Sequence, residues 1–206
     1  MKTFRGILAL LGLLLIVVAV PAALADAPTE GRIGRAELRF MEGMIDHHQM
    51  AIDMALDCLA REDVSDALRI ECQAVIDSQQ PEIEQMQAWL LAWYNVDYAP
   101  MSMSDMMGDD MPGMAGMEGM PATDPAMMMG MFAGFNRLEG MDYEVAWLES
   151  MIDHHNDAIH MSERLLERDA DSAAHAELRD LAQQIIDAQT EEIARYEDML
   201  TTMSAG

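Results

Sequence analysis

The segment FMEGMIDHHQMAIDM, residues 40–54, has a close copy in WLESMIDHHNDAIHM, residues 147–161. The two segments align without gaps, and each contains the pentapeptide MIDHH. Further along the chain, IDSQQPEI at 76–83 matches IDAQTEEI at 186–193. The offset between the copies grows from 107 to 110 residues, so the second copy has three more residues between its two segments. The chain therefore contains an internal repeat, and each unit consists of two segments around a short connection.

Both copies have the hydrophobic period of an amphipathic helix, because apolar positions recur with alternating steps of four and three. The first segments give the rows Phe40, Met44, His47, Ala51, Met54, Cys58 and Trp147, Met151, His154, Ala158, Met161, Leu165. The second segments give the rows Leu68, Cys72, Val75, Gln79, Met86, Trp93 and Leu178, Ile185, Gln189, Ile193, Tyr196, Leu200. We predict turns at 61–65 and 168–172. The expected fold is all-α, a four-helix bundle of two duplicated helical hairpins joined by a long Met-rich linker.

The N-terminus has the pattern of a secretory signal peptide. Lys2 and Arg5 precede an apolar run, and the small-residue site Ala-Leu-Ala ends at Ala25. An uncleaved membrane anchor is the alternative, but the run is short for a spanning helix. We therefore divide the chain into a signal peptide (1–25), a first hairpin (26–97), a Met-rich flexible linker (98–136) and a second hairpin (137–206). The mature protein is expected to be exported and free of the membrane.

The chain is strongly acidic, with a formal net charge of −25. Removal of the signal peptide takes the charge to −27 and leaves only arginine as a basic residue. Such a surface repels nucleic acid and anionic lipid and attracts cations, so a role in binding DNA is excluded. A surface adapted to solubility or high salt would have the same composition.

The two cysteines, Cys58 and Cys72, lie on either side of the first predicted turn. In an oxidising compartment a disulfide is the expected state, and it would pin two antiparallel helices together. A copper thiolate pair is the alternative. Leu165 replaces Cys58 in the second copy, so the pair is not part of the repeat.

Adjacent histidines on an apolar helical stripe are unusual, since a buried imidazole needs partners for its nitrogens. A single such residue would be interpreted as a hydrogen-bonded core histidine, but equivalent pairs in two repeats predict a cluster of nitrogen ligands. Methionines one turn or so away offer thioether sulfur, although methionine at this spacing also serves as core filler. The candidate metal ligands are His47, His48, His154, His155, His160, Met44, Met50, Met54, Met151 and Met161. Imidazole with soft thioether favours copper, as Cu(I) and also Cu(II), and silver by the same chemistry.

The linker is unlike the rest of the chain. Twelve methionines fall between Met101 and Met131, among Gly, Pro, Ser and Asp, which oppose a regular helix. The methionines Met111, Met114, Met117 and Met120 recur every three residues. Thioethers at this spacing can wrap one Cu(I), so we predict a Cu(I) trap here; a low-complexity hydrophobic tether is the alternative.

The second helix of each hairpin carries a polar pair at equivalent positions, Gln79 with Glu82 and Gln189 with Glu192. The glutamines interrupt apolar rows, and we predict that these residues orient the histidines through hydrogen bonds. Ordinary polar residues on a helix face are the alternative.

Motifs for catalysis are absent from the sequence. A di-iron bundle needs Glu-x-x-His on two helices, but Met44 and Ile45 stand three residues before His47 and His48. There is no nucleophile elbow, phosphate-binding loop or CxxC pair. We therefore expect a protein that is not an enzyme. The alternatives are a metal-dependent oxidoreductase, such as a cuprous oxidase or a di-iron-like enzyme, and a structural or ligand-sensing bundle with core histidines.

The segments MIDHHQMAIDMA and MIDHHNDAIHMSE, each followed by Gln-x-x-Glu-Ile, resemble the domain of unknown function 305 family. The resemblance covers about 36–93 and 142–203. It implies an exported, ferritin-like four-helix protein, periplasmic in some members, that binds copper and contributes to copper resistance. Matching ligand positions are Met44, His47, His48, Met54, Met151, His154, His155 and Met161. Family members often carry proline where Asp46 and Asp153 stand, and the cysteines are a private feature of this chain.

The sequence thus predicts an exported, periplasmic protein that sequesters copper or delivers it to a copper efflux or oxidase partner. Imidazole with its ordinary pKa near 6.5 would release the metal as the pH falls through that value.

Overall fold

The structure is a computed structural model, and it describes residues 28–100, 134–168 and 175–205. Four long helices make up the bundle, α1 (Gly31–Ala60), α2 (Asp66–Tyr94), α5 (Gly140–Arg168) and α6 (Ala176–Ser204). The described residues contain no strand. The predicted all-α bundle of two helical hairpins is therefore confirmed. The predicted signal peptide, most of the linker and most of the second turn lie outside the described residues.

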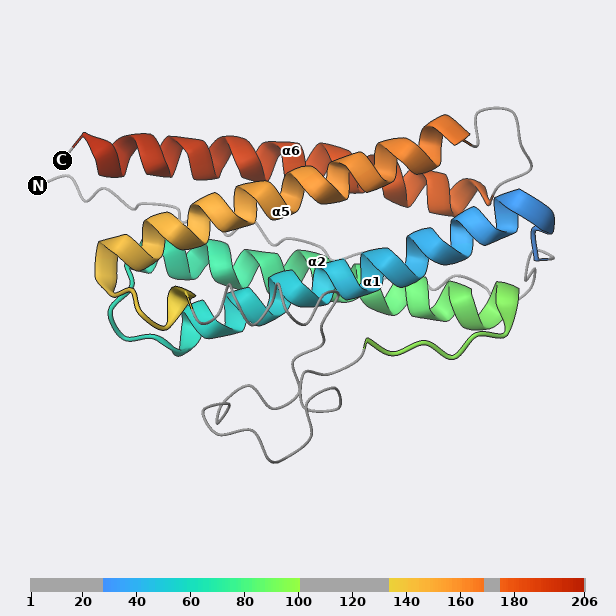
Figure 1. The fold of residues 1–206 in the computed structure, drawn as a ribbon, viewed down its shortest axis with the longest axis horizontal. Coiled ribbons are helices and arrows are strands. Elements are labelled where there is room, and N and C mark those ends of the chain that lie inside the picture. The colour runs from blue at the N-terminus through green and yellow to red at the C-terminus, as the bar shows by residue number, and fades with distance from the viewer. Residues whose placement is uncertain (1–27, 101–133, 169–174, 206) are drawn as a thin grey trace, which may run out of the picture.

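The two hairpins pack against each other mainly through their first helices. Figure 1 shows α1 with α2 as one antiparallel pair and α5 with α6 as the other, and α5 runs alongside α1. The two copies of the MIDHH segment therefore meet across the seam between α1 and α5. In the described part of the chain, no helix combines the length and the apolar character needed to cross a membrane.

Local sequence signals fix the ends of α2. The side chain of Ser65 accepts a hydrogen bond from the backbone N–H of Leu68 at 3.2 Å, which satisfies one of the free donors at the helix N-terminus. At the other end Asn95 adopts the left-handed conformation with φ 54°, and its N–H reaches the carbonyl groups of Leu90 and Leu91. The chain after Asn95 then leaves the helix axis.

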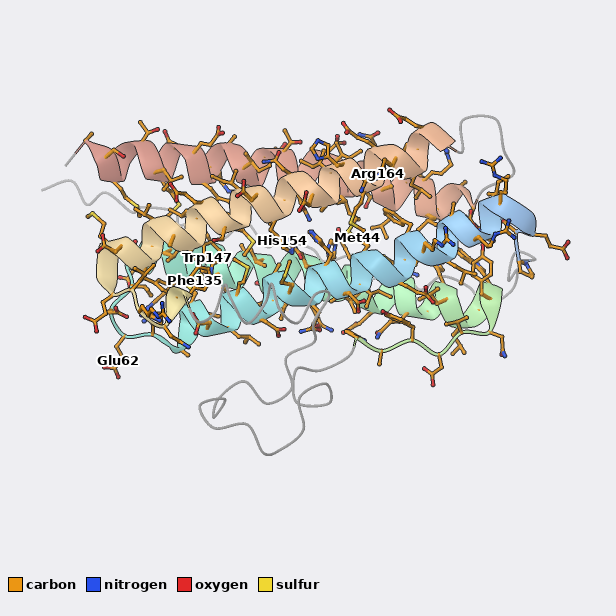
Figure 2. The ribbon with its side chains drawn as sticks, viewed as in Figure 1. Met44, Glu62, Phe135, Trp147, His154 and Arg164 are labelled. Carbon is orange, nitrogen blue, oxygen red and sulfur yellow. A yellow bond between two sulfur atoms is a disulfide. The ribbon has the colours of Figure 1, made fainter. Side chains whose placement is uncertain are left out.

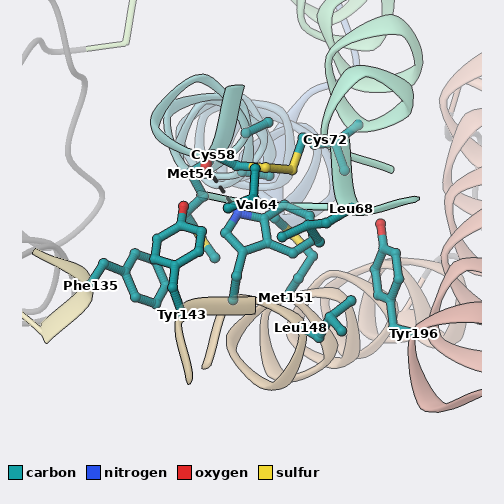
Figure 3. Packing of buried hydrophobic residues seen from close by; sticks show 14 of the residues in the cluster. Met54, Cys58, Val64, Leu68, Cys72, Phe135, Tyr143, Leu148, Met151 and Tyr196 are labelled. Carbon is teal, nitrogen blue, oxygen red and sulfur yellow. Dashed lines mark hydrogen bonds between the residues drawn. A yellow bond between two sulfur atoms is a disulfide. The ribbon is translucent and has the colours of Figure 1, made fainter. Parts of the chain in front are cut away.

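The hydrophobic interior consists of two clusters at opposite ends of the bundle. One surrounds Trp147 and Tyr143, and the other surrounds Phe40 and Trp93. The indole N–H of Trp147, which is fully buried, donates to the backbone carbonyl of Met54 at 3.0 Å and so links the two hairpins. Figure 3 shows the first cluster with this hydrogen bond and with the bridged cysteines at its edge.

Cys58 and Cys72 form a disulfide that joins α1 to α2 across the first turn, with 14 residues of sequence separation. Both cysteines are fully buried beside Leu68 and Val75. The disulfide stabilises the fold by restricting the unfolded chain. It is not part of the histidine site, because the histidines lie further along the helices.

Two buried glutamates connect the hairpins, and no local sequence pattern predicts these contacts. Glu37 near the start of α1 accepts hydrogen bonds from the backbone N–H and from Nδ1 of His175, both at 2.9 Å. His175 is the residue that precedes α6. Glu144 near the start of α5 accepts from the backbone N–H of Ser65 at 2.6 Å and from its hydroxyl at 2.9 Å, immediately before α2. Each first helix therefore caps the second helix of the other hairpin, where a carboxylate is favoured by the helix dipole.

The residues after α2 fold back along the bundle. The side-chain amide of Gln87 donates to the carbonyl oxygen of Tyr98 at 3.0 Å, and the Tyr98 hydroxyl donates to Asp46 at 2.7 Å. Asp46 immediately precedes His47. Tyr98, the first residue of the predicted linker, therefore lies beside the middle of α1.

Candidate metal centre

A layer of polar side chains crosses the bundle between the two hydrophobic clusters. Each of the four helices contributes two residues, which we call the histidine layer: His47, His48, Gln79, Glu82, His154, His155, Gln189 and Glu192. Along the helices this layer lies between Val75 and Ile83 on α2 and between Met151 and Ala158 on α5, members of opposite clusters. The histidines are buried, and His48 and His155 have no exposed surface. Because both hairpins supply equivalent residues, the layer has approximate twofold symmetry.

His47 and His154 meet at the seam between α1 and α5. Their ring centroids lie 3.6 Å apart, with the ring planes inclined by 35°. Nε2 of His154 donates a hydrogen bond to the backbone carbonyl of His47 at 2.8 Å. Figure 2 shows His154 in the middle of the bundle, near Met44 of the facing helix. The structure thus brings together one imidazole from each hairpin.

The other two histidines each pair with a glutamate of their own hairpin. Nε2 of His48 donates to Glu82 at 2.6 Å, and Nε2 of His155 donates to Glu192 at 2.8 Å. A carboxylate on Nε2 fixes the tautomer, so the lone pair of the neutral ring lies on Nδ1. Metal-binding histidines commonly use such a partner to orient the ring and raise its basicity.

Several nitrogens of the layer are buried without a hydrogen-bond partner. They are both ring nitrogens of His47 and Nδ1 of His48, His154 and His155. A buried polar atom without a partner costs about 1–3 kcal/mol, so four such rings in one layer need a physical explanation. A ligand that accepts imidazole lone pairs would satisfy them.

The two central histidines are held in their neutral form. The pKa of His47 is lowered to about 3, mainly by burial and in addition by the neighbouring His48 and His155. Burial also lowers the pKa of His154 well below its ordinary value, with a further contribution from His47. The neutral ring is the form that binds a metal, since protonation removes the lone pair. The ordinary pKa of about 6.5 therefore does not apply to these two side chains in the metal-free fold.

The thioethers of the predicted site lie on both sides of the layer. Met44, Met54 and Met151 are fully buried, and Met50 is buried as well. Met44 belongs to the cluster around Phe40, whereas the other three belong to the cluster around Trp147. Two further buried methionines, Met41 and Met86, were not among the candidates, although both follow the apolar period of their helices.

Two predicted ligands lie outside the layer. His160 is exposed on α5, because six residues from His154 corresponds to a different face of the helix. Met161 is partly buried at the seam, against Gly43 of α1. The linker methionines Met111, Met114, Met117 and Met120 lie outside the described residues.

The orienting role predicted for the second helices belongs to the glutamates rather than to the glutamines. Glu82 and Glu192 bond to the histidines directly. Both amide atoms of Gln79 and the amide oxygen of Gln189 are buried without a partner. The glutamine amides therefore add buried polar atoms without partners rather than hydrogen bonds to imidazole.

Within the described ranges, no three His, Cys, Asp or Glu side chains already surround a common point closely enough to hold an ion. The imidazoles are adjacent, but His154 is engaged with a carbonyl and its ring lies against the ring of His47. Binding a metal through this layer therefore requires side-chain rotation, with the backbone positions already in place.

The bundle and its histidine layer define a class of small helical proteins with a polar centre shared between two repeated hairpins. The sequence pattern of the domain of unknown function 305 (DUF305) matches residues 37–200. The chain therefore belongs to the DUF305 family, as the repeated segments predict. No curated protein matches the chain.

Solved structures similar to this chain have the same fold. A DUF305 fragment from Deinococcus radiodurans is 27% identical with a TM-score of 0.62, over 86% of this chain and 99% of that chain. A DUF305 protein from Streptomyces coelicolor is 25% identical with a TM-score of 0.61, over 82% and 94%. CopM in its Cu(II)-bound form is 25% identical with a TM-score of 0.59, over 81% and 96%. CopM structures with Cu(I) and with silver bound, at 22% and 21% identity, show likeness of fold alone.

Proposed function

We propose that this protein is an exported copper-binding protein that sequesters Cu(I) and Cu(II), or delivers them, for copper tolerance or homeostasis. The observation that carries the proposal is the set of buried imidazole nitrogens without partners, contributed by both hairpins to one layer. The Cu(II)-bound form of CopM, a similar structure, supports the choice of metal. Silver, which CopM also binds, is a further cargo consistent with thioether chemistry.

The chemistry of the layer fits copper better than harder ions. Neutral imidazole is a borderline ligand that binds Cu(I) and Cu(II), and thioether sulfur is soft and selects Cu(I). His48 and His155 can offer Nδ1 while Nε2 stays bonded to glutamate. His47 offers either nitrogen, and His154 offers Nδ1 while its Nε2 stays bonded to the carbonyl of His47. Met44, Met54 and Met151, which flank the layer, supply sulfur.

The Met-rich linker would add capacity for Cu(I). Its proposed role rests on the sequence, in which thioethers recur every three residues from Met111 to Met120. The hydrogen bond from Tyr98 to Asp46 places the chain before the linker next to His47. We propose that Cu(I) passes between the linker thioethers and the histidine layer.

We propose that copper is a cargo that the protein binds without catalysing a reaction. An efflux or oxidase partner would be the recipient of that copper. The measurement for this point is oxygen uptake with excess Cu(I). A cargo protein consumes no oxygen beyond the amount that oxidises its bound metal. Continued uptake would instead identify a cuprous oxidase.

The central test replaces His47 and His154 together by leucine, which fills much of the same volume and leaves no buried polar atom. We expect H47L/H154L to fold with the same helical circular dichroism and to lose the ordered Cu(II) sites measured by calorimetry. The matched control is His160→Ala, an exposed histidine of the same helix, and it should keep them. Full Cu(II) stoichiometry in H47L/H154L would show that the layer is not the binding site.

A further inference from the structure

A groove of about 150 Å³ runs along the seam between α1 and α5, toward the end of the bundle where α1 begins. It is lined by Ala36, Arg39, Phe40, Met161, Arg164 and Leu165. Each helix thus supplies one arginine and apolar side chains. The groove lies about two helical turns from the contact between His47 and His154, since residues 40 and 47 are seven apart on one helix.

Arg39 and Arg164 place two positive charges in one groove of a chain whose net charge is −25. Among the described residues, neither Arg39 nor Arg164 takes part in an ion pair, although Glu42 and Glu163 are close in sequence. Arg61 and Arg195 pair with carboxylates, but several other described arginines, such as Arg32 and Arg137, form no ion pair either. What distinguishes Arg39 and Arg164 is that both line the same groove from facing helices. The groove is therefore a place where two guanidinium groups from facing helices remain available to an external anion.

A glycine of α1, Gly43, lies against Met161, one of the residues that line the groove. A Cβ at Gly43 would lie 3.3 Å from the terminal methyl of Met161, so the absence of a side chain lets this thioether lie against α1. Gly43 is one helical turn from His47. Met161, a predicted ligand that the histidine layer does not include, thus lies between the arginines and the histidine contact.

We infer that this groove binds a small anion with several carboxylate groups, and that copper reaches the seam as an anionic complex of such a carrier. The inference rests on the proposed function. A guanidinium group pairs with a carboxylate through two parallel hydrogen bonds, and two arginines on opposite walls can hold two carboxylates at once. Most of the charge on this chain is negative and repels an anionic complex, so a groove with a positive charge on each wall favours docking there. No electrons are transferred, because copper changes ligands and the carrier leaves unchanged.

The experiment uses citrate as the probe and compares it with glycinate, which forms a neutral Cu(II) complex. Calorimetry first measures metal-free citrate binding to the metal-free protein, and stopped-flow absorbance then measures Cu(II) uptake from each carrier. We expect R39Q/R164Q to weaken citrate binding at least tenfold and to slow uptake from citrate severalfold, with uptake from glycinate and final stoichiometry unchanged. The control R32Q/R137Q removes the same charge from two exposed arginines outside the groove and should resemble the wild type.

The outcomes separate this inference from the proposed function. If wild-type protein binds no citrate, or if both double variants lose citrate binding equally, the groove is not an anion site, whatever the copper stoichiometry. If citrate binds at the groove but H47L/H154L keeps every Cu(II) site, the proposed metal centre fails while the anion site stands. Equal slowing of uptake from citrate and glycinate in R39Q/R164Q would overturn docking of the anionic complex.

Discussion

Glu37 and Glu144 occupy equivalent positions in the two repeats, 107 residues apart, and each caps the first turn of the other hairpin's second helix. The contact crosses between hairpins in both directions. The two halves of the histidine layer are therefore held in register by reciprocal carboxylate caps at both ends of the bundle, in addition to the apolar seam between α1 and α5.

Removing one cap should destabilise the bundle measurably. Glu37 is fully buried and accepts from His175 twice and from the hydroxyl of Tyr94. Glu37→Ala leaves these donors without their acceptor, at an expected cost of about 2–4 kcal/mol in the free energy of unfolding. Urea denaturation followed by circular dichroism measures it. The exposed Glu149→Ala on α5 should change stability by less than about 0.5 kcal/mol, and a similarly small change in Glu37→Ala would contradict the capping role.

The glutamate partners of the histidines should affect affinity more than capacity. Glu192→Gln weakens the hydrogen bond that orients His155, so we expect copper affinity to fall about 10- to 100-fold with unchanged stoichiometry. Competition with a chelator of known affinity measures the change. Glu191→Gln, an exposed neighbour on the same helix, is the matched control. Equal affinities for the two variants would show that the contact with His155 has no part in binding.

The stability of the metal-free protein should fall in acid because of the buried histidines. The pKa of His47 is about 3 in the fold and near 6.5 in the unfolded chain, so the unfolded state binds more protons between these values. The contribution is complete above pH 6.5 and is lost as the pH falls toward 3, with a slope of at most about 1.4 kcal/mol per pH unit for this group. Urea midpoints of wild type and His47→Leu across this range test it, and parallel curves would refute it.

Asp53 should act in the opposite direction at higher pH. Burial raises the pKa of its carboxyl to about 8, although a hydrogen bond from Gln49 lowers it in part. The folded state then keeps a proton that the unfolded state has lost, so stability decreases as the pH rises from about 4 to 8. Between pH 6.5 and 8 this effect is separate from that of His47. Asp53→Asn should flatten the stability profile in that window, and a profile identical to the wild type would rule out a protonated Asp53.

Loss of the disulfide should lower stability without affecting copper binding. Reduction of Cys58–Cys72, or the double variant C58S/C72S, is expected to lower the free energy of unfolding by about 3 kcal/mol for a loop of this length. Because the bridge joins α1 and α2 away from the histidine layer, Cu(II) stoichiometry of the folded variant should not change. Thermal unfolding with and without reductant, followed by copper titration, checks both parts. Loss of copper sites in a folded variant would link the cysteines to metal binding.

Deletion of residues 101–131 should separate the two proposed kinds of copper binding. The deletion removes the thioether run and leaves every residue of the histidine layer. We expect Cu(I) capacity under reducing conditions to fall and Cu(II) stoichiometry to remain. A variant with every methionine of this segment changed to leucine controls for the altered length. Unchanged Cu(I) capacity in both variants would leave the segment as a tether.

The sequence predicts the fold well because the repeat and the helical period both depend on short-range spacing. Residue numbers alone place His47 and His154 on the apolar stripes of their own helices. The seam that joins the two residues follows from the need to bury both stripes. The partners of the histidines could not be chosen in the same way. Glu82 and Gln79 share a helix face, and only the rotation of α2 against α1 decides which of them reaches His48.

The sequence contains a sign of the reciprocal caps, although it does not identify them. Glu37 and Glu144 have the same offset as the paired histidines, yet they lie at helix starts where acidic residues are common. Their burial depends on the other hairpin, which no local pattern reveals. His160 is the opposite case. Its side chain could bind a metal and it lies near the repeated motif, but the face of α5 on which it stands is exposed to solvent.

The meeting of His47 with His154 takes place within one continuous polypeptide. Two separate hairpins would have to find each other in solution, and their shared centre would dissociate on dilution. A single chain replaces that bimolecular step by an intramolecular one, so the centre stays assembled however scarce the protein is. Metal occupancy of the proposed centre would then not depend on the concentration of the protein itself.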